Sequence, residues 1–428
     1  MHQVILAPIE MDSSTLLLII SVALFVGFLA NHLFVRYRAP DVLLLIFFGM
    51  LLGPGALGII DHGLAAQISR MITYVAAVAL SIIMLQAGMG LRIRAVLTTF
   101  HRALVLTLAA FFASIAVTTL VCVAAMGWGL GESMLLGAIL GGTSGAIVIP
   151  LVNALDVSSG VKSMLTVEAA VTDVLVITVA MVIMSVLASG SADLTLVAAD
   201  TLVVFLVSGV AGLLGGLLWL KVLSCISKQP FLYMVTLAFM LLIFSITELS
   251  VGMGGGAIAA LAFGLTLGNS DGLPRRVQGM LECRCNPKII DFHDEISFFV
   301  RTFFFIYLGL VLSTVALTSL DVLAGVVVFN VIVLGRIAVT GSLGRWLCKG
   351  RKDRATLLFM MPRGLAAAVV ASLPLSLGVV GSEVGNMIGA ITAVVILLTT
   401  CFASVGAYII ERWEERSDLL SEQAVEVR

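Results

Sequence analysis

Residues 141–150 read GGTSGAIVIP and lie inside an otherwise apolar run that covers residues 132–153. A run of this length can cross the hydrocarbon core of a membrane, which takes about 20 helical residues. Two adjacent glycines, a threonine–serine pair and a proline halfway across predict that the helix is broken there. Unwound backbone would expose carbonyl and hydroxyl oxygens at membrane depth, and cations such as Na⁺ prefer oxygen ligands of this kind.

The composition of the whole chain indicates a membrane protein. Hydrophobic residues make up 60% of the 428 residues and charged residues only 11%, whereas a soluble domain carries roughly 25% charged residues. The basic residues are scattered through short loops, which argues against nucleic-acid binding. We expect one transmembrane domain over residues 1–411, surrounded by lipid, and a short cytoplasmic tail over 412–428. No resident cofactor is expected.

Apolar runs of spanning length predict an all-α polytopic fold with about thirteen transmembrane helices. The predicted spans are 14–35, 40–60, 68–90, 102–127, 132–153, 162–188, 196–220, 230–248, 252–269, 292–316, 321–345, 355–378 and 386–411.

Lysine and arginine fall on one set of alternate loops, for example at Arg36, Arg92 and Arg351. The other loops, around residues such as Glu132 and Asp321, contain no basic residue. Because cytoplasmic loops carry the excess of positive charge, the N-terminus is expected outside and the C-terminus in the cytoplasm. A prokaryotic inner (plasma) membrane is the expected location.

A faint internal repeat accompanies this pattern. The third span contains IMLQAGMGL at residues 83–91 and the tenth FIYLGL at 305–310, both ending in a glycine–leucine pair. The twelfth span has its own irregularity, MPRG at 361–364, seven spans after the break in the fifth. Secondary transporters are often built from inverted repeats. We therefore predict two six-helix inverted repeats, about 14–188 and 230–411, with broken crossing helices in spans 5 and 12.

Ionisable residues at membrane depth are costly and are by default functional or paired. Glu168 and Asp173 lie in the sixth span, Arg301 in the tenth and Arg363 in the twelfth. Asp173 is expected ~16 Å deep at ~1.5 Å per residue. The five-residue separation turns it roughly 140° away from Glu168. The two acids should therefore face different neighbours.

Arg363 is expected at a depth close to that of Glu168, so the sequence predicts a structural ion pair between them. Arg336 is a lesser case, interpreted as structural, and Arg301 as either a structural counter-charge or a modulating charge near the site. Asp173 is then left without a dedicated cation. A buried carboxylate of that kind suits a group that binds a proton in one state and a metal cation in another.

These residues resemble the cation:proton antiporters of the NhaP and eukaryotic sodium/proton exchanger branch. EAAVTD at 168–173 looks like the family's E-S-x-x-N-D segment, and PRG at 362–364 like its R-G motif. Thr143-Ser144 stands where the family has T-D-P, and Arg301 in the place of a basic residue on the tenth helix.

The resemblance implies a homodimer in which a bundle holding the crossing helices moves against a dimerisation bundle. It also implies that Asp173 alternately binds a proton and Na⁺ (or Li⁺, sometimes K⁺) in electroneutral one-for-one exchange. Thr172, Thr143 and Ser144 complete the expected ion and proton site, with Asp173 and Thr143 as Na⁺ ligands.

Three departures leave the selectivity open: Thr172 replaces the family's Asn, Ala169 a Ser, and Ser144 an Asp. A K⁺-selective efflux antiporter and a gated cation channel-like system are the alternatives. An enzyme is not expected. An aspartyl hydrolase needs two facing carboxylates, and Asp173 has no second aspartate at its depth. A zinc hydrolase needs histidine ligands, and the five histidines are dispersed.

Overall fold

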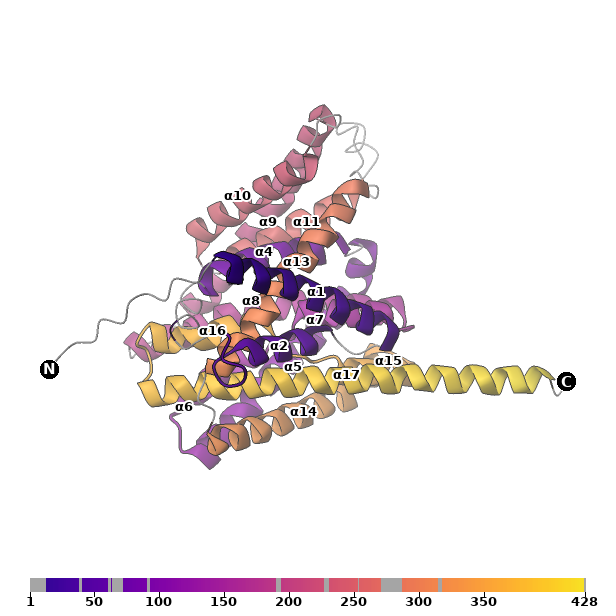
Figure 1. Cartoon of the computed structure of the whole chain (residues 1–428). Helices are drawn as coiled ribbons and strands as arrows, with labels where there is room; N and C mark the ends of the chain where they lie inside the picture. Colours follow the sequence, from indigo (N-terminus) through magenta and orange to yellow (C-terminus); the bar gives the residue numbers. More distant parts are fainter. Residues whose placement is uncertain are drawn as a thin grey trace.

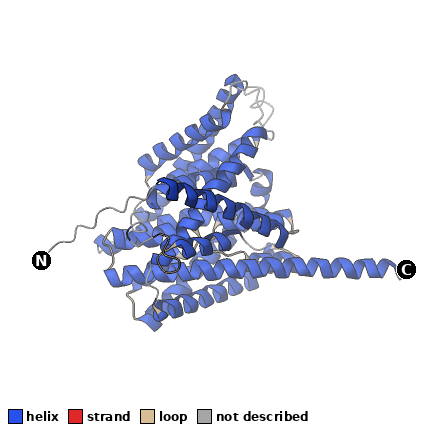
Figure 2. Ribbon diagram, viewed as in Figure 1, coloured by secondary structure: helices blue, strands red, loops and turns tan. Residues whose placement is uncertain are grey.

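The computed structural model describes residues 13–37, 41–60, 63, 72–90, 93–189, 194–226, 231–252, 254–270, 287–314 and 318–426. Within these ranges the regular structure is helical, without strands (Figure 2). The first half contains α1 (Ser13–Tyr37), α2 (Asp41–Leu52), α4 (Ile72–Gly90), α5 (Ile93–Val121) with a π-helical turn at Cys122–Met126, α6 (Leu130–Ile139), α7 (Gly145–Ala154) and α8 (Ser159–Ser189). After α9 (Leu194–Ile226), the second half contains α10 (Leu232–Val251), α11 (Gly255–Gly268), α13 (Pro287–Thr314), α14 (Ser319–Leu347), α15 (Arg351–Phe359), α16 (Leu365–Ser376) and α17 (Ser382–Glu426).

Each of the thirteen predicted spans falls on one of these helices or, for the fifth and twelfth, on a pair of half-helices. Six of the described helices are long and apolar enough to cross a membrane by themselves. These segments are Thr99–Met126, Ser159–Ala188, Leu202–Ile226, Leu232–Val251, Ser319–Leu347 and Ser382–Trp413. The prediction of an all-α polytopic membrane fold is confirmed.

Both predicted helix breaks are present. The fifth span is divided into α6 and α7 by non-helical residues 140–144, and the twelfth into α15 and α16 by residues 360–364. Glycines at 141 and 142 disfavour helix in the first break. In the second, Pro362 lacks a backbone N–H and biases Met361 away from helical geometry. The sequence chemistry at each position thus accounts for the local structure.

The helices sort into two bundles according to which helices pack together (Figure 1). The core bundle consists of α5–α8 and α14–α17, and the flanking bundle of α1, α2, α4, α9, α10, α11 and α13. Only sparse contacts join them in the described part of the chain, mainly from α4 to α7, α8 and α16. Both helix breaks lie in the core bundle.

The predicted repeat has a counterpart in two close helix crossings of the flanking bundle. A Cβ atom built on Gly309 of α13 would lie 3.0 Å from the Cα of Gly49 in α2. One built on Gly88 of α4 would lie 3.0 Å from the Cα of Gly264 in α11. The first crossing joins spans ten and two, the second spans three and nine. An inverted repeat that equates spans two and three with nine and ten predicts this correspondence.

The last span does not end with its apolar residues. α17 begins at Ser382 and continues to Glu426, a single helix of 45 residues. At ~1.5 Å per residue it is about 68 Å long. The predicted tail from residue 412 is therefore a helical continuation of the thirteenth span up to Glu426, and it projects beyond both bundles (Figure 1).

Candidate ion-binding site

The two helix breaks contact one another through the backbone. The N–H of Ser144 donates a 2.7 Å hydrogen bond to the carbonyl oxygen of Pro362. Gly364 allows this approach, because a Cβ atom there would lie 2.6 Å from the Cβ of Ser144. Four half-helix ends therefore converge at one place inside the core bundle. Such ends present unpaired N–H and C=O groups.

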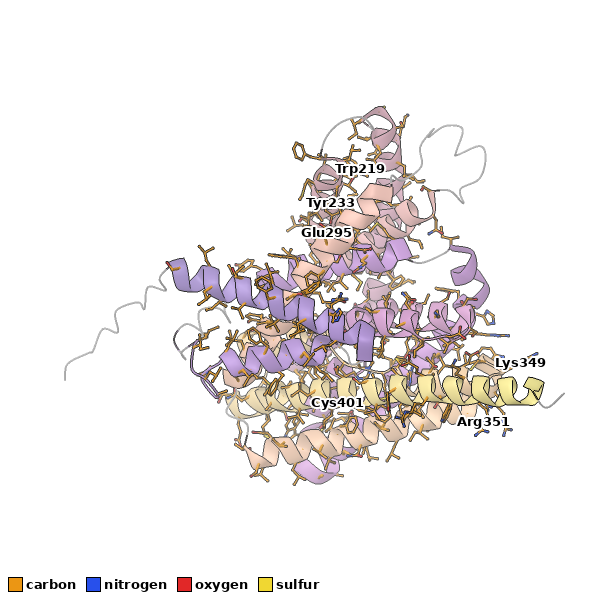
Figure 3. The ribbon with its side chains drawn as sticks, turned by 45° about the vertical axis from the view of Figure 1, so that its right-hand side comes forward. Trp219, Tyr233, Glu295, Lys349, Arg351 and Cys401 are labelled. Atoms are coloured by element: carbon orange, nitrogen blue, oxygen red, sulfur yellow. The ribbon has the colours of Figure 1, made fainter. Side chains whose placement is uncertain are left out.

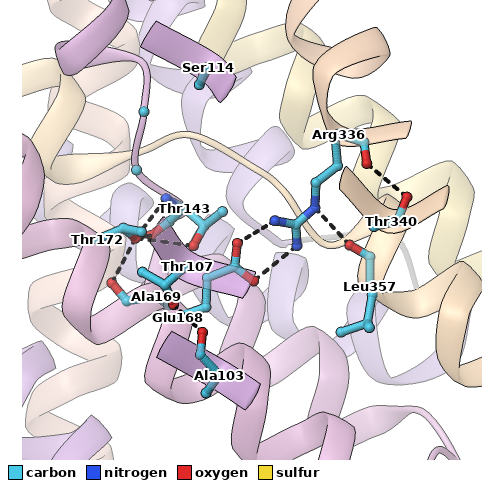
Figure 4. A network of polar contacts seen from close by, with 12 residues as sticks. Ala103, Thr107, Ser114, Thr143, Glu168, Ala169, Thr172, Arg336, Thr340 and Leu357 are labelled. Atoms are coloured by element: carbon cyan, nitrogen blue, oxygen red, sulfur yellow. Dashed lines mark hydrogen bonds and ion pairs between the residues drawn. The ribbon is translucent and has the colours of Figure 1, made fainter. Parts of the chain in front are cut away.

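Thr172 on α8 holds the first break. Its Oγ1 accepts a 3.0 Å hydrogen bond from the N–H of Thr143 and lies 3.3 Å from the Thr143 Oγ1 (Figure 4). The carbonyl oxygens available to the Thr172 hydroxyl are those of Ala169, at 3.2 Å, and Thr143, at 3.4 Å. The structure thus brings Thr143 and Thr172 together, as the sequence predicted, but the Thr172 hydroxyl is already engaged in fixing the break.

Thr399 on α17 makes the same contact in the second half. The N–H of Arg363 donates a 3.0 Å hydrogen bond to its Oγ1. In each half, then, a buried threonine on the following helix accepts from a backbone N–H within the break. We refer to Thr172 and Thr399 as the two threonine clamps. Sequence reasoning missed Thr399; the signal was its place on the helix that follows the second break, as Thr172 lies on the helix that follows the first.

Asp173 follows the first clamp directly on α8 and is buried, with 6% of its surface exposed. Within the part of the chain that the structure describes, no side chain pairs with its carboxylate. Its neighbour in sequence is tied to Thr143, so Asp173 is fixed next to the first break. This is the arrangement in which a buried carboxylate needs a proton or a bound cation to neutralise it.

The second buried acid of α8, Glu168, pairs with Arg336 of α14 (Figure 4). The guanidinium is bidentate: Nη2 donates to Glu168 Oε2 at 2.9 Å, and Nη1 donates to Oε1. The Arg336 Nε donates to the carbonyl of Leu357, at 2.8 Å, near the end of α15. The predicted pairing of Glu168 with Arg363 was wrong. Depth along the membrane normal did not distinguish the two arginines, and the packing of α14 against α15 brings Arg336 to Glu168.

Arg363 instead binds the end of α6. Its Nη1 donates to the carbonyl oxygens of Gly142 and Gly141, at 2.7 and 3.3 Å, and its Nη2 to Ser114 Oγ, at 3.3 Å. These carbonyls lie at the partially negative C-terminal end of a half-helix, which a cation stabilises. Arg363 therefore fastens the second break to the first. The carbonyls freed by Gly141 and Gly142 were the signal that sequence reasoning did not use.

A cavity of about 430 Å³ lies between the two bundles, beside this site. Its lining comes from α4, α7 and α13, namely Ile83, Gln86, Ala87, Met89, Gly90, Gly145, Ile149, Pro150, Asn153, Asp294 and Arg301. Gly145 directly follows Ser144, so the cavity reaches the edge of the first break. The structure places Arg301 in this cavity, on α13. Gln86 and Asp294 are lining residues that sequence reasoning did not single out as functional.

Replacing Thr399 with valine is expected to lower the thermal stability of the purified protein. The buried N–H of Arg363 would lose its acceptor, which costs about 1–3 kcal/mol. Thr400→Val is the matched control, because the Thr400 hydroxyl is equally buried but donates its hydrogen bond to the carbonyl of Ile396 in its own helix. Thermal unfolding in detergent measures the difference. Equal melting temperatures for the two variants, or a failure of Thr399→Ser to retain stability, would contradict the clamp.

The sequence of this chain is similar to those of known membrane proteins. The family described as "Sodium/hydrogen exchanger, transmembrane" matches residues 20–410. A protein of Shewanella oneidensis named K(+)/H(+) antiporter NhaP2 is 26% identical over 362 residues. A protein of the same name from Shewanella baltica is 24% identical over 360 residues. Each alignment covers 81% of this chain and 58% of the relative, so the chain spans about three fifths of their length.

The fold also matches a solved structure, the sodium proton antiporter MjNhaP1 from Methanocaldococcus jannaschii at pH 8. The TM-score is 0.73 at 20% sequence identity, covering 92% of this chain and 98% of that one. A second structure of the same protein, from electron microscopy, gives a TM-score of 0.75. At this identity the likeness establishes the fold alone.

Proposed function

Because the chain belongs to the sodium/hydrogen exchanger family, a family of membrane transporters, we propose that it exchanges a monovalent cation for protons across the membrane. The observation that carries this proposal is the contrast between the two buried acids of α8. Glu168 is neutralised by Arg336, whereas Asp173 lies beside the first break without a partner among the described residues. A proton and a cation are the two species that can neutralise it in turn.

In this proposal Asp173 binds the proton and the cation alternately. The carbonyl and hydroxyl oxygens of Thr143 and the hydroxyl of Ser144 supply further ligands, of the kind that Na⁺ accepts at unwound helices. Thr172 contributes by holding Thr143 in place rather than through a free hydroxyl. Glu168, Arg336 and Arg363 fix the helices around the site.

Na⁺ is the cation we propose, with Li⁺ or K⁺ as alternatives. The name of the solved relative specifies sodium and the names of the Shewanella relatives specify potassium. One carboxylate that carries either one proton or one monovalent cation gives the same charge in both loaded states. Exchange at such a site is electroneutral and one-for-one.

Alternating access follows from the two bundles. Sparse contacts and a cavity between them permit the core bundle to move against the flanking bundle with the site intact. In this proposal the cavity opens on the side of the positively charged loops, which we assign to the cytoplasm, since its lining includes residues at the ends of α4 and α7, such as Gly90 and Asn153. A homodimer built on the flanking bundle, in a prokaryotic inner membrane with the N-terminus outside, completes the proposal.

The test is exchange by the purified protein in proteoliposomes with a preset pH gradient. Addition of Na⁺, Li⁺ or K⁺ should collapse the gradient for the transported cation, and clamping the membrane potential should leave the rate unchanged. A potential-dependent rate would overturn electroneutrality. Rapid cation flux without proton movement would instead identify a channel.

A further inference from the structure

The cavity between the bundles contains an acid of its own. Asp294 on α13 lines it, and its Oδ1 accepts a 3.0 Å hydrogen bond from Nε2 of Gln86 on α4. The Gln86 amide oxygen remains as an acceptor. Asn153, near the end of α7, lines the same cavity from the core bundle. A carboxylate and two amides from three helices therefore face one water-accessible space.

These groups lie toward the ends of their helices: Gln86 is four residues before the end of α4 at Gly90, and Asp294 is seven residues after the start of α13 at Pro287. Asn153 is eight residues along α7 from Gly145, which adjoins the first break. At ~1.5 Å per residue the two positions are about 12 Å apart. A cation that enters beside Asn153 would meet these oxygens before it reached Thr143 and Asp173.

Arg301 lies further along the same face of α13. It is seven residues beyond Asp294, nearly two full helical turns, so both side chains point in similar directions about 10 Å apart. Both residues line the cavity. Asp294 is the nearer of the two to the start of α13, so the negative and the positive charge are separated along the cavity wall. The carboxylate of Asp294 therefore favours a cation at its own end of the cavity.

We propose that Asp294 and Gln86 form a second, weaker cation site, the vestibule site, which concentrates the transported monovalent cation before it moves to Asp173. The inference rests on the proposed function. A carboxylate in a hydrated cavity attracts a monovalent cation weakly, enough to raise its local occupancy roughly five-fold at contact distance. The vestibule site should therefore set the apparent affinity for the cation but not the maximum rate of exchange.

The test compares Asp294→Asn with the wild-type protein in proteoliposomes, measuring exchange rate against cation concentration. Asparagine keeps an oxygen acceptor for Gln86 and removes the charge. We expect the apparent KM for the cation to rise roughly five-fold, because the cation loses its attraction to one carboxylate charge at contact distance in water. The maximum rate should not change. Added impermeant salt should reduce the difference, since it screens an exposed charge.

Glu295→Gln is the matched control. It removes the same charge from the adjacent residue of α13, which is exposed but does not line the cavity and lies on the flanking bundle (Figure 3). Its apparent KM should stay at the wild-type value, and Asp294→Glu should restore it. An unchanged KM in Asp294→Asn, or a loss confined to the maximum rate, would overturn the vestibule site. Absence of exchange in the wild-type protein would instead overturn the proposed function.

Discussion

Replacing Asp173 with asparagine is expected to abolish exchange completely while leaving the protein folded. Asparagine has almost the same shape and remains polar, but it neither accepts a proton at neutral pH nor offers a negative charge to a cation. The melting temperature should stay equal or rise, because an uncompensated buried carboxylate is removed. Exchange in proteoliposomes and thermal unfolding of the same preparation provide the two measurements.

Glu248→Gln is the control for the loss of an acid from a membrane helix. Glu248 lies near the end of α10 in the flanking bundle, where its carboxylate accepts hydrogen bonds from the N–H groups of Gly254 and Gly256. This variant should continue to exchange. If Asp173→Asn exchanges as fast as the wild type, Asp173 is not the transport site. If both variants lose activity, the effect is not specific to Asp173.

Breaking the ion pair between Glu168 and Arg336 is expected to have the largest effect on stability. Arg336→Met strands a carboxylate that is 1% exposed, and Glu168→Gln strands a guanidinium that is 4% exposed. Removal of one partner of a buried pair typically costs about 3–5 kcal/mol. The double variant should recover much of this loss, because neither charge is then left uncompensated. Thermal unfolding of the four proteins gives the coupling energy.

A second double-mutant cycle distinguishes the observed pair, Glu168 with Arg336, from the pair expected from depth alone, Glu168 with Arg363. Glu168→Gln combined with Arg363→Met should show weaker coupling than the first cycle, because Arg363 binds the carbonyls of Gly141 and Gly142 instead. Stronger coupling of Glu168 to Arg363 than to Arg336 would show that Arg363, and not Arg336, neutralises Glu168.

The membrane spans and both helix breaks could be predicted from the sequence because their causes are local. Apolar length determines whether a segment crosses the membrane. Glycine, proline and clustered hydroxyls determine where a helix cannot continue. The adjacency of Thr143 and Thr172 also followed, since the fifth and sixth spans are consecutive and the polar positions lie at similar depth.

The partner of Glu168 could not be predicted in the same way. Sequence position gives the depth of a side chain and the face of its own helix, but not which distant helix packs against that face. Arg336 and Arg363 were both buried arginines at plausible depths, and only the contacts of α14 with α15 and α5 distinguish them. The same limit applies to Asp294, whose importance depends on a cavity formed by three separate helices.

The unbroken course of α17 gives the protein a lever arm. The helix contributes Thr399 to the crossing of the breaks and continues without interruption to Glu426. A rotation of a few degrees about the clamp would displace the far end by several ångströms, since about 27 residues or 40 Å of helix lie between them. A distance probe attached near the end of α17 would therefore magnify core-bundle motions that are too small to follow at the ion site.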